Sequence, residues 1–257
     1  MTPTLSALAL GAVVGLALGL VGGGGSILTV PILIYALGEN VHLATGTSLA
    51  IVGANALVAA WDHARAGRVR LSVALVFGGA GILGALGGAW LNHLAPARLL
   101  LLGFAVLMLA AAVAMLRGCL SDQPTSEAQQ EPFSPRVLLA GLAVGILTGF
   151  FGVGGGFLVV PALVLVLGLP MREAVGTSLV VIAINAAAAL AGHLRYGGID
   201  VTITLLFIAG GAGGSLVGSR LSGRLDERRL RQGFTGMVVL IALSMLARTV
   251  LGPAVPA

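Results

Sequence analysis

The chain contains one pattern of residues twice, and this duplication limits the possible folds more than any other feature. GLVGGGGSILTVP at residues 19–31 returns as GFFGVGGGFLVVP at 149–161, and ATGTSLAIVGANALVAAWDHARAG at 44–67 returns as AVGTSLVVIAINAAAALAGHLRYG at 174–197. Both pairs lie 130 positions apart, so no gap is needed to align them. Shared Pro, Asn, His and Gly-Thr-Ser residues at one constant spacing indicate an internal repeat, not a chance match between apolar sequences.

A polar stretch at residues 118–135 separates the two copies, and its Pro, Ser, Gln and Glu content is typical of a solvated linker. We therefore divide the chain into a first repeat at 1–117, this linker, and a second repeat at 136–257. Each repeat contains about five apolar segments. They span about 5–21, 26–38, 41–61, 71–93 and 98–117, then 137–151, 156–168, 173–192, 200–219 and 230–250.

The composition places these segments in a membrane. Hydrophobic residues make up 58% of the chain and charged residues only 9%, whereas soluble domains carry about 25% charged residues. Most of the longer segments approach the roughly 20 apolar residues that a spanning helix needs. The sequence thus predicts an all-α, polytopic membrane protein. It excludes a large catalytic domain outside the membrane and, because the arginines are scattered through short gaps, a nucleic-acid-binding face.

The arginines also predict how the two repeats are oriented. In the first repeat they concentrate between segments three and four, at Arg65, Arg68 and Arg70, whereas in the second repeat they concentrate between segments four and five, around residues 220–231. Both gaps should face the cytoplasm, because cytoplasmic loops are enriched in positive charge. Equivalent gaps then lie on opposite sides of the membrane, which predicts repeats of inverted topology, a cytoplasmic linker and both termini outside.

Glycine clusters precede the short second segment of each repeat and predict a broken helix there. Glycine permits a tight break, and the N-terminus of the helix that follows offers free N–H groups and a positive dipole end to an anion. Matched interrupted helices of this kind hold the substrate in transporters built from inverted repeats. The alternative role is tight helix packing. The residues concerned are Gly22, Gly24, Gly25 and Ser26, then Gly152, Gly154, Gly155 and Gly156.

Polar residues recur within the third segment of each repeat and form a second candidate site. Thr47 and Asn55 are eight residues apart, which is about 12 Å along one helix face. Asn in the bilayer centre is costly unless it is hydrogen-bonded, and its amide can donate to the oxygens of an anion. The alternative role is interhelical hydrogen bonding. The full set is Thr47, Ser48, Asn55, Thr177, Ser178 and Asn185.

Histidine and arginine recur at the ends of the third segments, as His63 with Arg65 and His193 with Arg195. Interfacial anchoring is the simpler role for them, and a proton-linked or electrostatic gate is the other.

No acidic residue lies in the middle of an apolar segment, which disfavours a cation substrate. The glycine clusters lack the Lys-Ser/Thr of a P-loop, and the single Cys excludes a multi-Cys metal site. We expect no cofactor, no metal and a small neutral or anionic solute.

Together, the duplicated G-x-x-G-x-G-G segment ending in Pro, the following G-T-S and the Asn further along resemble the sulfite exporter TauE/SafE family, also called the toluene-sulfonate uptake permeases. The likeness runs from about residue 8 to 250. The copies depart from each other at Gly23, which is Val153 in the second, and at Ser26, which is Gly156. The resemblance implies a multi-pass carrier for sulfite, sulfonates or related anions in the inner membrane of a bacterium or archaeon, often working as an exporter.

Other functions remain open at this point. An anion channel and a carrier of another anion, such as a carboxylate, fit the same residues. An intramembrane hydrolase does not, because Ser48 and His63 are 15 residues and about 22 Å apart on one helix. We therefore predict that the chain is not an enzyme. Its partners are the lipid bilayer and a small anion. The substrate, the coupling ion, the full crossing of segments one and two, and the formation of a homo-oligomer are left undetermined.

Overall fold

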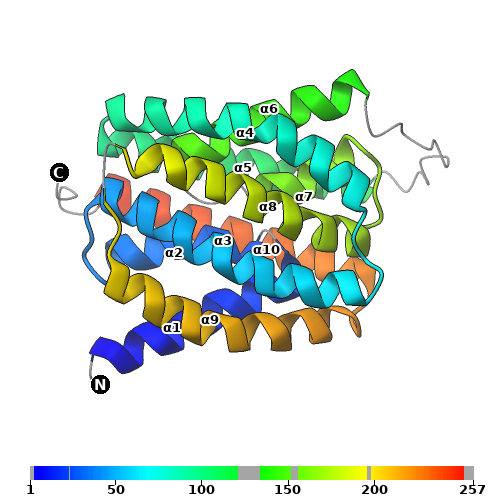
Figure 1. Cartoon of the computed structure of the whole chain (residues 1–257), viewed down its shortest axis with the longest axis horizontal. Coiled ribbons are helices and arrows are strands. Elements are labelled where there is room, and N and C mark those ends of the chain that lie inside the picture. Colours follow the sequence, from blue (N-terminus) through cyan, green and yellow to red (C-terminus); the bar gives the residue numbers. More distant parts are fainter. Residues whose placement is uncertain (1–2, 23, 121–133, 152–155, 196–197, 252–257) are drawn as a thin grey trace.

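The chain folds into a bundle of helices, seen here in a computed structural model (Figure 1). The structure describes residues 3–22, 24–120, 134–151, 156–195 and 198–251. Ten α-helices and no strands occur in these ranges. They are α1 (Pro3–Val21), α2 (Gly24–Tyr35), α3 (Val41–Arg65), α4 (Leu71–Leu94), α5 (Ala97–Leu120), α6 (Pro135–Phe151), α7 (Gly156–Leu165), α8 (Met171–His193), α9 (Val201–Ser222) and α10 (Glu227–Leu251). Each apolar segment expected from the sequence corresponds to one of these helices.

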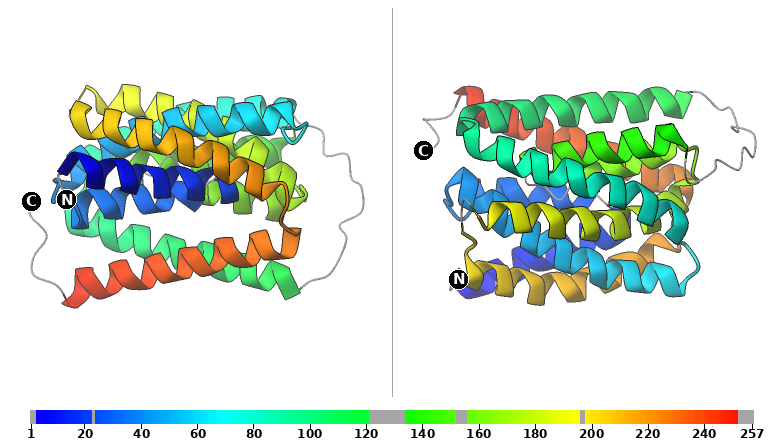
Figure 2. Two further views of the ribbon diagram at one scale, coloured as in Figure 1. Left: turned by 90° about the horizontal axis from the view of Figure 1, so that it is seen from below. Right: turned by 45° about the horizontal axis from the view of Figure 1, so that its top comes forward.

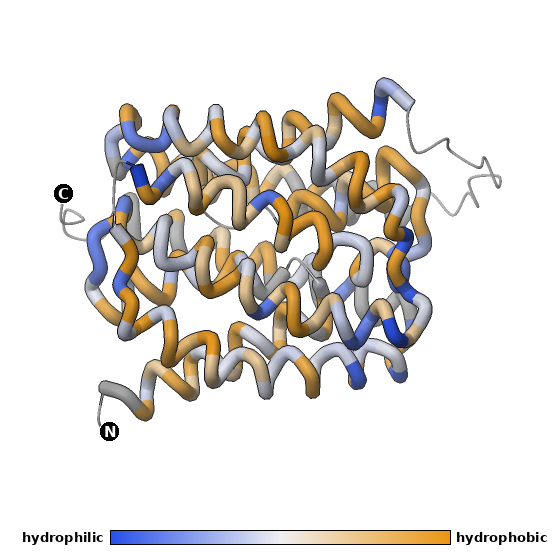
Figure 3. The backbone as a smooth tube through the Cα atoms, viewed as in Figure 1, coloured by the Kyte–Doolittle hydropathy of each residue, from blue (hydrophilic) through white to orange (hydrophobic). Residues whose placement is uncertain are grey.

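The helices differ in length as the sequence predicts. Within the described residues, α3, α4, α8 and α9 are long and apolar enough to cross a membrane. The helices α2 and α7 have only 12 and 10 residues, and each contains a proline, Pro31 or Pro161, which removes a backbone hydrogen bond. Hydrophilic residues gather at the two ends of the bundle and apolar residues fill the length between them (Figure 3). This distribution suits a multi-pass membrane protein.

The two repeats are not separate bodies, because the first helix of each packs on the fourth helix of the other. A Cβ added to Gly15 of α1 would lie 2.0 Å from the carbonyl oxygen of Gly211 in α9. The matching contact joins Gly145 of α6 to Gly81 of α4, where the same distance is 2.2 Å. Real Cβ atoms do not approach so closely, so these helices meet backbone to backbone. Such close packing stabilises helix pairs in membranes.

Helices α3 and α8 lie side by side in the middle of a row made by α4, α8, α3 and α9, and they run in opposite directions (Figure 1). Each packs parallel to one helix of the other repeat: α3 lies against α9, and α8 lies against α4. Helices α5 and α10, which correspond in the two repeats, contact each other along one side of the bundle (Figure 2). The candidate residues of α3 and α8 therefore lie where the two repeats contact each other.

Candidate functional site

Two repeat-equivalent asparagines lie midway along α3 and α8, and neither side chain has a hydrogen-bond partner among the described residues. Asn55 in α3 and Asn185 in α8 are both fully buried, and within the described structure neither the Nδ2 nor the Oδ1 atom of either side chain has a partner. Asn55 packs against Gly211 of α9, and Asn185 packs against Gly81 of α4. A buried polar group left unpaired costs about 1–3 kcal/mol. The hydrogen-bonding capacity of these two amides is therefore unused within the described residues.

The Gly-Thr-Ser serines lie between the asparagines and the ends of the bundle, and one of them meets a helix break. Gly22 follows α1 and has a positive φ of 69°, which a residue with a side chain rarely adopts. A Cβ on Gly22 would lie 2.9 Å from Ser178 Oγ in the other repeat. Ser178 Oγ itself donates to the carbonyl of Val175 at 2.8 Å, whereas Ser48 Oγ is buried without a partner in the described structure.

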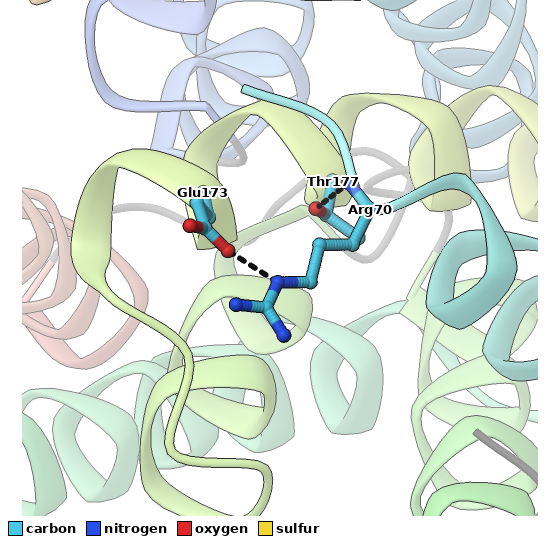
Figure 4. Close-up of polar contacts among 3 residues, drawn as sticks. All are labelled: Arg70, Glu173 and Thr177. Atoms are coloured by element: carbon cyan, nitrogen blue, oxygen red, sulfur yellow. Dashed lines mark hydrogen bonds and ion pairs between the residues drawn. The ribbon is translucent and has the colours of Figure 1, made fainter. Parts of the chain in front are cut away.

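The two threonines of this motif each bind the backbone of the opposite repeat. Thr47 Oγ1 accepts the backbone N–H of Asp200 at 3.0 Å, and Thr177 Oγ1 accepts that of Arg70, also at 3.0 Å. Asp200 and Arg70 are the N-cap residues of α9 and α4. At one end of the bundle the Arg70 guanidinium also pairs with Glu173, as Figure 4 shows. The threonine oxygens thus join the repeats at opposite ends of the molecule. This is the interhelical hydrogen bonding that the sequence analysis gave as their alternative role.

The two histidines make one matched contact within each repeat. His63 Nε2 donates to the carbonyl of Gly19 at 3.2 Å, and His193 Nε2 donates to that of Gly149 at 3.1 Å. Both carbonyls belong to the last turn of a helix, α1 or α6, a position where carbonyl groups in general need a partner from outside the helix. Both histidines are buried. Each histidine therefore binds the end of the helix that precedes a glycine cluster, a contact that sequence reasoning did not foresee.

The remaining predicted residues are placed as follows. Gly24 and Gly25 open α2, Ser26 is buried in its first turn, and Gly156 opens α7. Arg65 and Arg195 are exposed, and the Arg65 guanidinium lies 5.7 Å from the centroid of the Trp61 ring. In the described ranges, no three His, Cys, Asp or Glu side chains gather as metal ligands would. Gly152, Gly154 and Gly155 lie outside the described residues.

Sequence reasoning missed several buried polar groups outside the repeated motifs. Glu39, in the turn between α2 and α3, is only 8% exposed. Thr204, Ser215 and Ser219 are buried along α9, and Ser219 donates to the Asp62 carboxylate. None of these residues is repeated in the other half of the sequence. A comparison of the two repeats for positions that are polar in only one of them would have found these residues.

The fold and these contacts describe a multi-pass helical membrane protein whose polar centre lies between two duplicated halves, and comparison with known proteins identifies it as a membrane transporter. The chain belongs to the sulfite exporter TauE/SafE family, whose model matches residues 7–245. The resemblance seen in the duplicated motifs is thereby confirmed.

Similar proteins occur in bacteria and archaea. A probable membrane transporter protein of Xylella fastidiosa is 38% identical over 246 residues, which cover 93% of each chain. The probable membrane transporter protein YdhB of Bacillus subtilis is 29% identical over 83% of this chain and 88% of its own. A probable membrane transporter protein of Methanocaldococcus jannaschii is 26% identical over 92% of each chain. No solved structure matches the chain significantly.

Proposed function

We propose that this protein exports sulfite, an organosulfonate or a related sulfur-containing anion across the inner membrane of a bacterium or archaeon by alternating access. The observation that carries this proposal is the matched pair of buried amides at Asn55 and Asn185, which have no partner in the part of the chain that the structure describes. Membership of the sulfite exporter family supports the substrate class.

The chemistry of the site suits an oxyanion. Each Asn Nδ2 can donate two hydrogen bonds and the Ser48 hydroxyl one more, while no charged side chain is needed. The helix N-termini at Gly24 and Gly156 would add backbone donors and a positive dipole end. Neutral donors bind an anion without a permanent positive charge. Release of the anion on the other side of the membrane therefore costs less free energy than release from a cationic side chain.

The distribution of charge supports an inverted arrangement of the two repeats. Eleven of the fourteen arginines lie at the end of the bundle where α5 stops and α6 starts, and Arg98, Arg195 and Arg248 lie at the other end. The positive-inside rule assigns the first end to the cytoplasm. Both termini then face outward, and an anion leaving the inside-negative cell gains roughly 2.3 kcal/mol per charge for each 100 mV.

The two threonine contacts provide one closure at each end of this path. We assign Thr47 with Asp200 to the outer closure and Thr177 with Arg70 to the cytoplasmic one. Both bonds are formed in the structure, and we interpret this arrangement as an occluded state. Alternating access would break one bond while the other holds, so that the central amides face a single side at a time.

A crosslink across the outer closure tests this proposal. The paired variant T47C/D200C is made in a chain whose single native cysteine is replaced (Cys119→Ala) and is reconstituted in proteoliposomes. Oxidation should abolish counterflow of labelled sulfite, and reduction should restore it. The single variants T47C and D200C, treated with the same oxidant, control for chemical damage. Undiminished flux through the crosslinked protein would contradict alternating access, and flux without counterflow or saturation would indicate a channel.

A further inference from the structure

The interface between α3 and α9 contains polar groups that the matching interface between α8 and α4 lacks. Thr204, Ser215 and Ser219 are buried on α9. The hydroxyls of Thr204 and Ser215 have no partner in the described structure. The residues 130 positions earlier on α4 are all alanine, at Ala74, Ala85 and Ala89. Spacings of 11 and 4 residues keep the three hydroxyls close to one face of α9.

One end of this face meets a buried carboxyl group. Both carboxylate oxygens of Glu39 are buried without a partner in the described structure, and the carboxylate that faces them is Asp200, the N-cap of α9. His42, the next titratable group along the chain, has its Nδ1 3.3 Å from Asn92 Oδ1. Burial first, and then the charge of Asp200, raise the pKa of Glu39 to about 7. Leu169 is the repeat equivalent of Glu39, so this group also occurs once.

The other end of the face meets a second carboxyl group. Ser219 Oγ donates to Asp62 Oδ2 near the end of α3, beside His63, and the repeat equivalents of this pair are Ala89 and Gly192. Three contacts define the register of the parallel helices α3 and α9. They are Thr47 with Asp200, Asn55 with Gly211, and Asp62 with Ser219. From residue 200 to residue 219, α9 rises about 28 Å, close to the thickness of the hydrocarbon core.

We propose that this face of α9 is a proton path that couples proton entry to anion export. Glu39 accepts a proton from the outer solution, and water together with the hydroxyls of Thr204, Ser215 and Ser219 relays it to Asp62. Each hydroxyl accepts one proton and donates its own to the next group, so no proton is gained or lost along the path. The ligand of this site is a proton, carried by ordered water.

The middle of the path coincides with the proposed anion site. Thr204 and Ser215 are about 16 Å apart along the helix, and the unpaired amide of Asn55 lies between them against Gly211. A buried water needs two or more polar partners, and this amide supplies both a donor and an acceptor. The anion and the proton path therefore share Asn55, which gives a physical reason for their movements to be linked. The inference rests on the proposed export function for its direction.

Proteoliposomes test the coupling and the transport separately. Counterflow of labelled methanesulfonate without a pH gradient measures transport alone. A trapped pH dye then follows protons during net methanesulfonate flux, because a sulfonate stays ionised and carries no proton through the lipid. For the variant E39Q we expect counterflow to persist within about twofold and proton movement to fall at least tenfold. The variant E39D keeps a titratable group and should therefore retain part of the proton movement.

A matched pair on α9 tests the relay. T204V removes a buried hydroxyl and should slow proton movement severalfold, whereas T202V removes an exposed one two residues away and should not. Persisting counterflow shows that each variant is folded. Net methanesulfonate flux by the unaltered protein without proton movement, or unchanged proton movement in E39Q, would overturn the path.

A spectroscopic measurement keeps the inference testable if no sulfur oxyanion is transported, an outcome that would contradict the proposed function alone. Infrared spectra of the unaltered chain should then contain a protonated carboxyl C=O band that is missing from the spectra of E39Q. This band should disappear as the pH rises through about 7. Its absence would overturn Glu39 as a proton site, whatever the transported solute.

Discussion

Thr47 Oγ1 accepts the backbone N–H of Asp200 at 3.0 Å, across the boundary between the two repeats. The same bond, at the same length, joins Thr177 to Arg70 at the other end of the bundle. A threonine that binds the start of a helix in the opposite repeat can act as a closure, because one hydrogen bond contributes only about 1 kcal/mol and is readily exchanged.

Removing one closure should open one end of the transporter. The variant T47V keeps the side-chain volume but loses the acceptor, and a loss of about 1 kcal/mol shifts the equilibrium roughly fivefold. Reporter cysteines at the buried, repeat-equivalent positions 44 and 174 (A44C and A174C), placed in the Cys119→Ala background, measure accessibility to a maleimide. T47V should accelerate labelling at position 44 only, and T177V at position 174 only. Equal acceleration at both positions would contradict separate closures.

The two asparagines should matter more for transport than for stability. N55A and N185A each remove an unpaired buried amide, so the free energy of unfolding should change little or rise, since no hydrogen bond between protein groups is lost. Transport should fall at least tenfold, mainly through KM for the anion. Thermal unfolding in detergent and initial rates of flux measure the two effects. Loss of stability with normal KM would assign the asparagines a purely structural role.

The glycines behind the asparagines should tolerate no side chain. A Cβ at Gly211 would lie 2.3 Å from Asn55 Nδ2, and one at Gly81 would lie 2.4 Å from Asn185 Oδ1. G211A and G81A should therefore displace the amide or separate the helices, and lower both transport and thermal stability. G213A and G79A are matched controls, because a Cβ at either position meets nothing within 4 Å. The controls should gain up to about 1 kcal/mol from higher helix propensity. Similar behaviour of the two pairs would rule out this packing.

Stability should depend on pH through Glu39. The pKa of this carboxyl is raised from 4.5 to about 7 in the folded chain, so between these values the folded state holds a proton that the unfolded state has lost. Stability therefore falls as the pH rises through this window and stays low above it. E39Q should remove this dependence, and its gain in Tm over the unaltered chain should be larger at pH 8 than at pH 5. A constant difference in Tm would show that Glu39 does not titrate on folding.

Much of the architecture could be predicted because it follows from apolar segment length and from the duplication. The ten helices of the described ranges fall on the expected segments, and the break at Gly22 has the positive φ that its glycine allows. The contact partners were harder to foresee. Nothing in the local sequence says that α1 packs on α9 and not on its own neighbours, since small residues at intervals of four occur in several helices.

The buried polar residues of the candidate site could be predicted only where the repeats agree. Asn55 and Asn185 stand out because a buried amide is costly and both copies keep it. His63 and His193 also recur, but helix-end position suggested an interface, and their bonds to the carbonyls of Gly19 and Gly149 depend on how α1 and α6 end. Glu39 resembles an ordinary loop carboxylate in sequence. Its burial comes from packing at the start of α9, which is a tertiary effect.

The most direct test of the central claim is flux of labelled sulfite in proteoliposomes under an imposed membrane potential, with sulfonates, sulfate, thiosulfate and carboxylates as competitors. We predict saturable flux that rises as the sulfite-containing side becomes more negative, is inhibited best by sulfur oxyanions, and is lost in the double variant N55A/N185A. Folded, inserted protein that moves no sulfur oxyanion, or moves one equally well without both asparagines, would contradict the account.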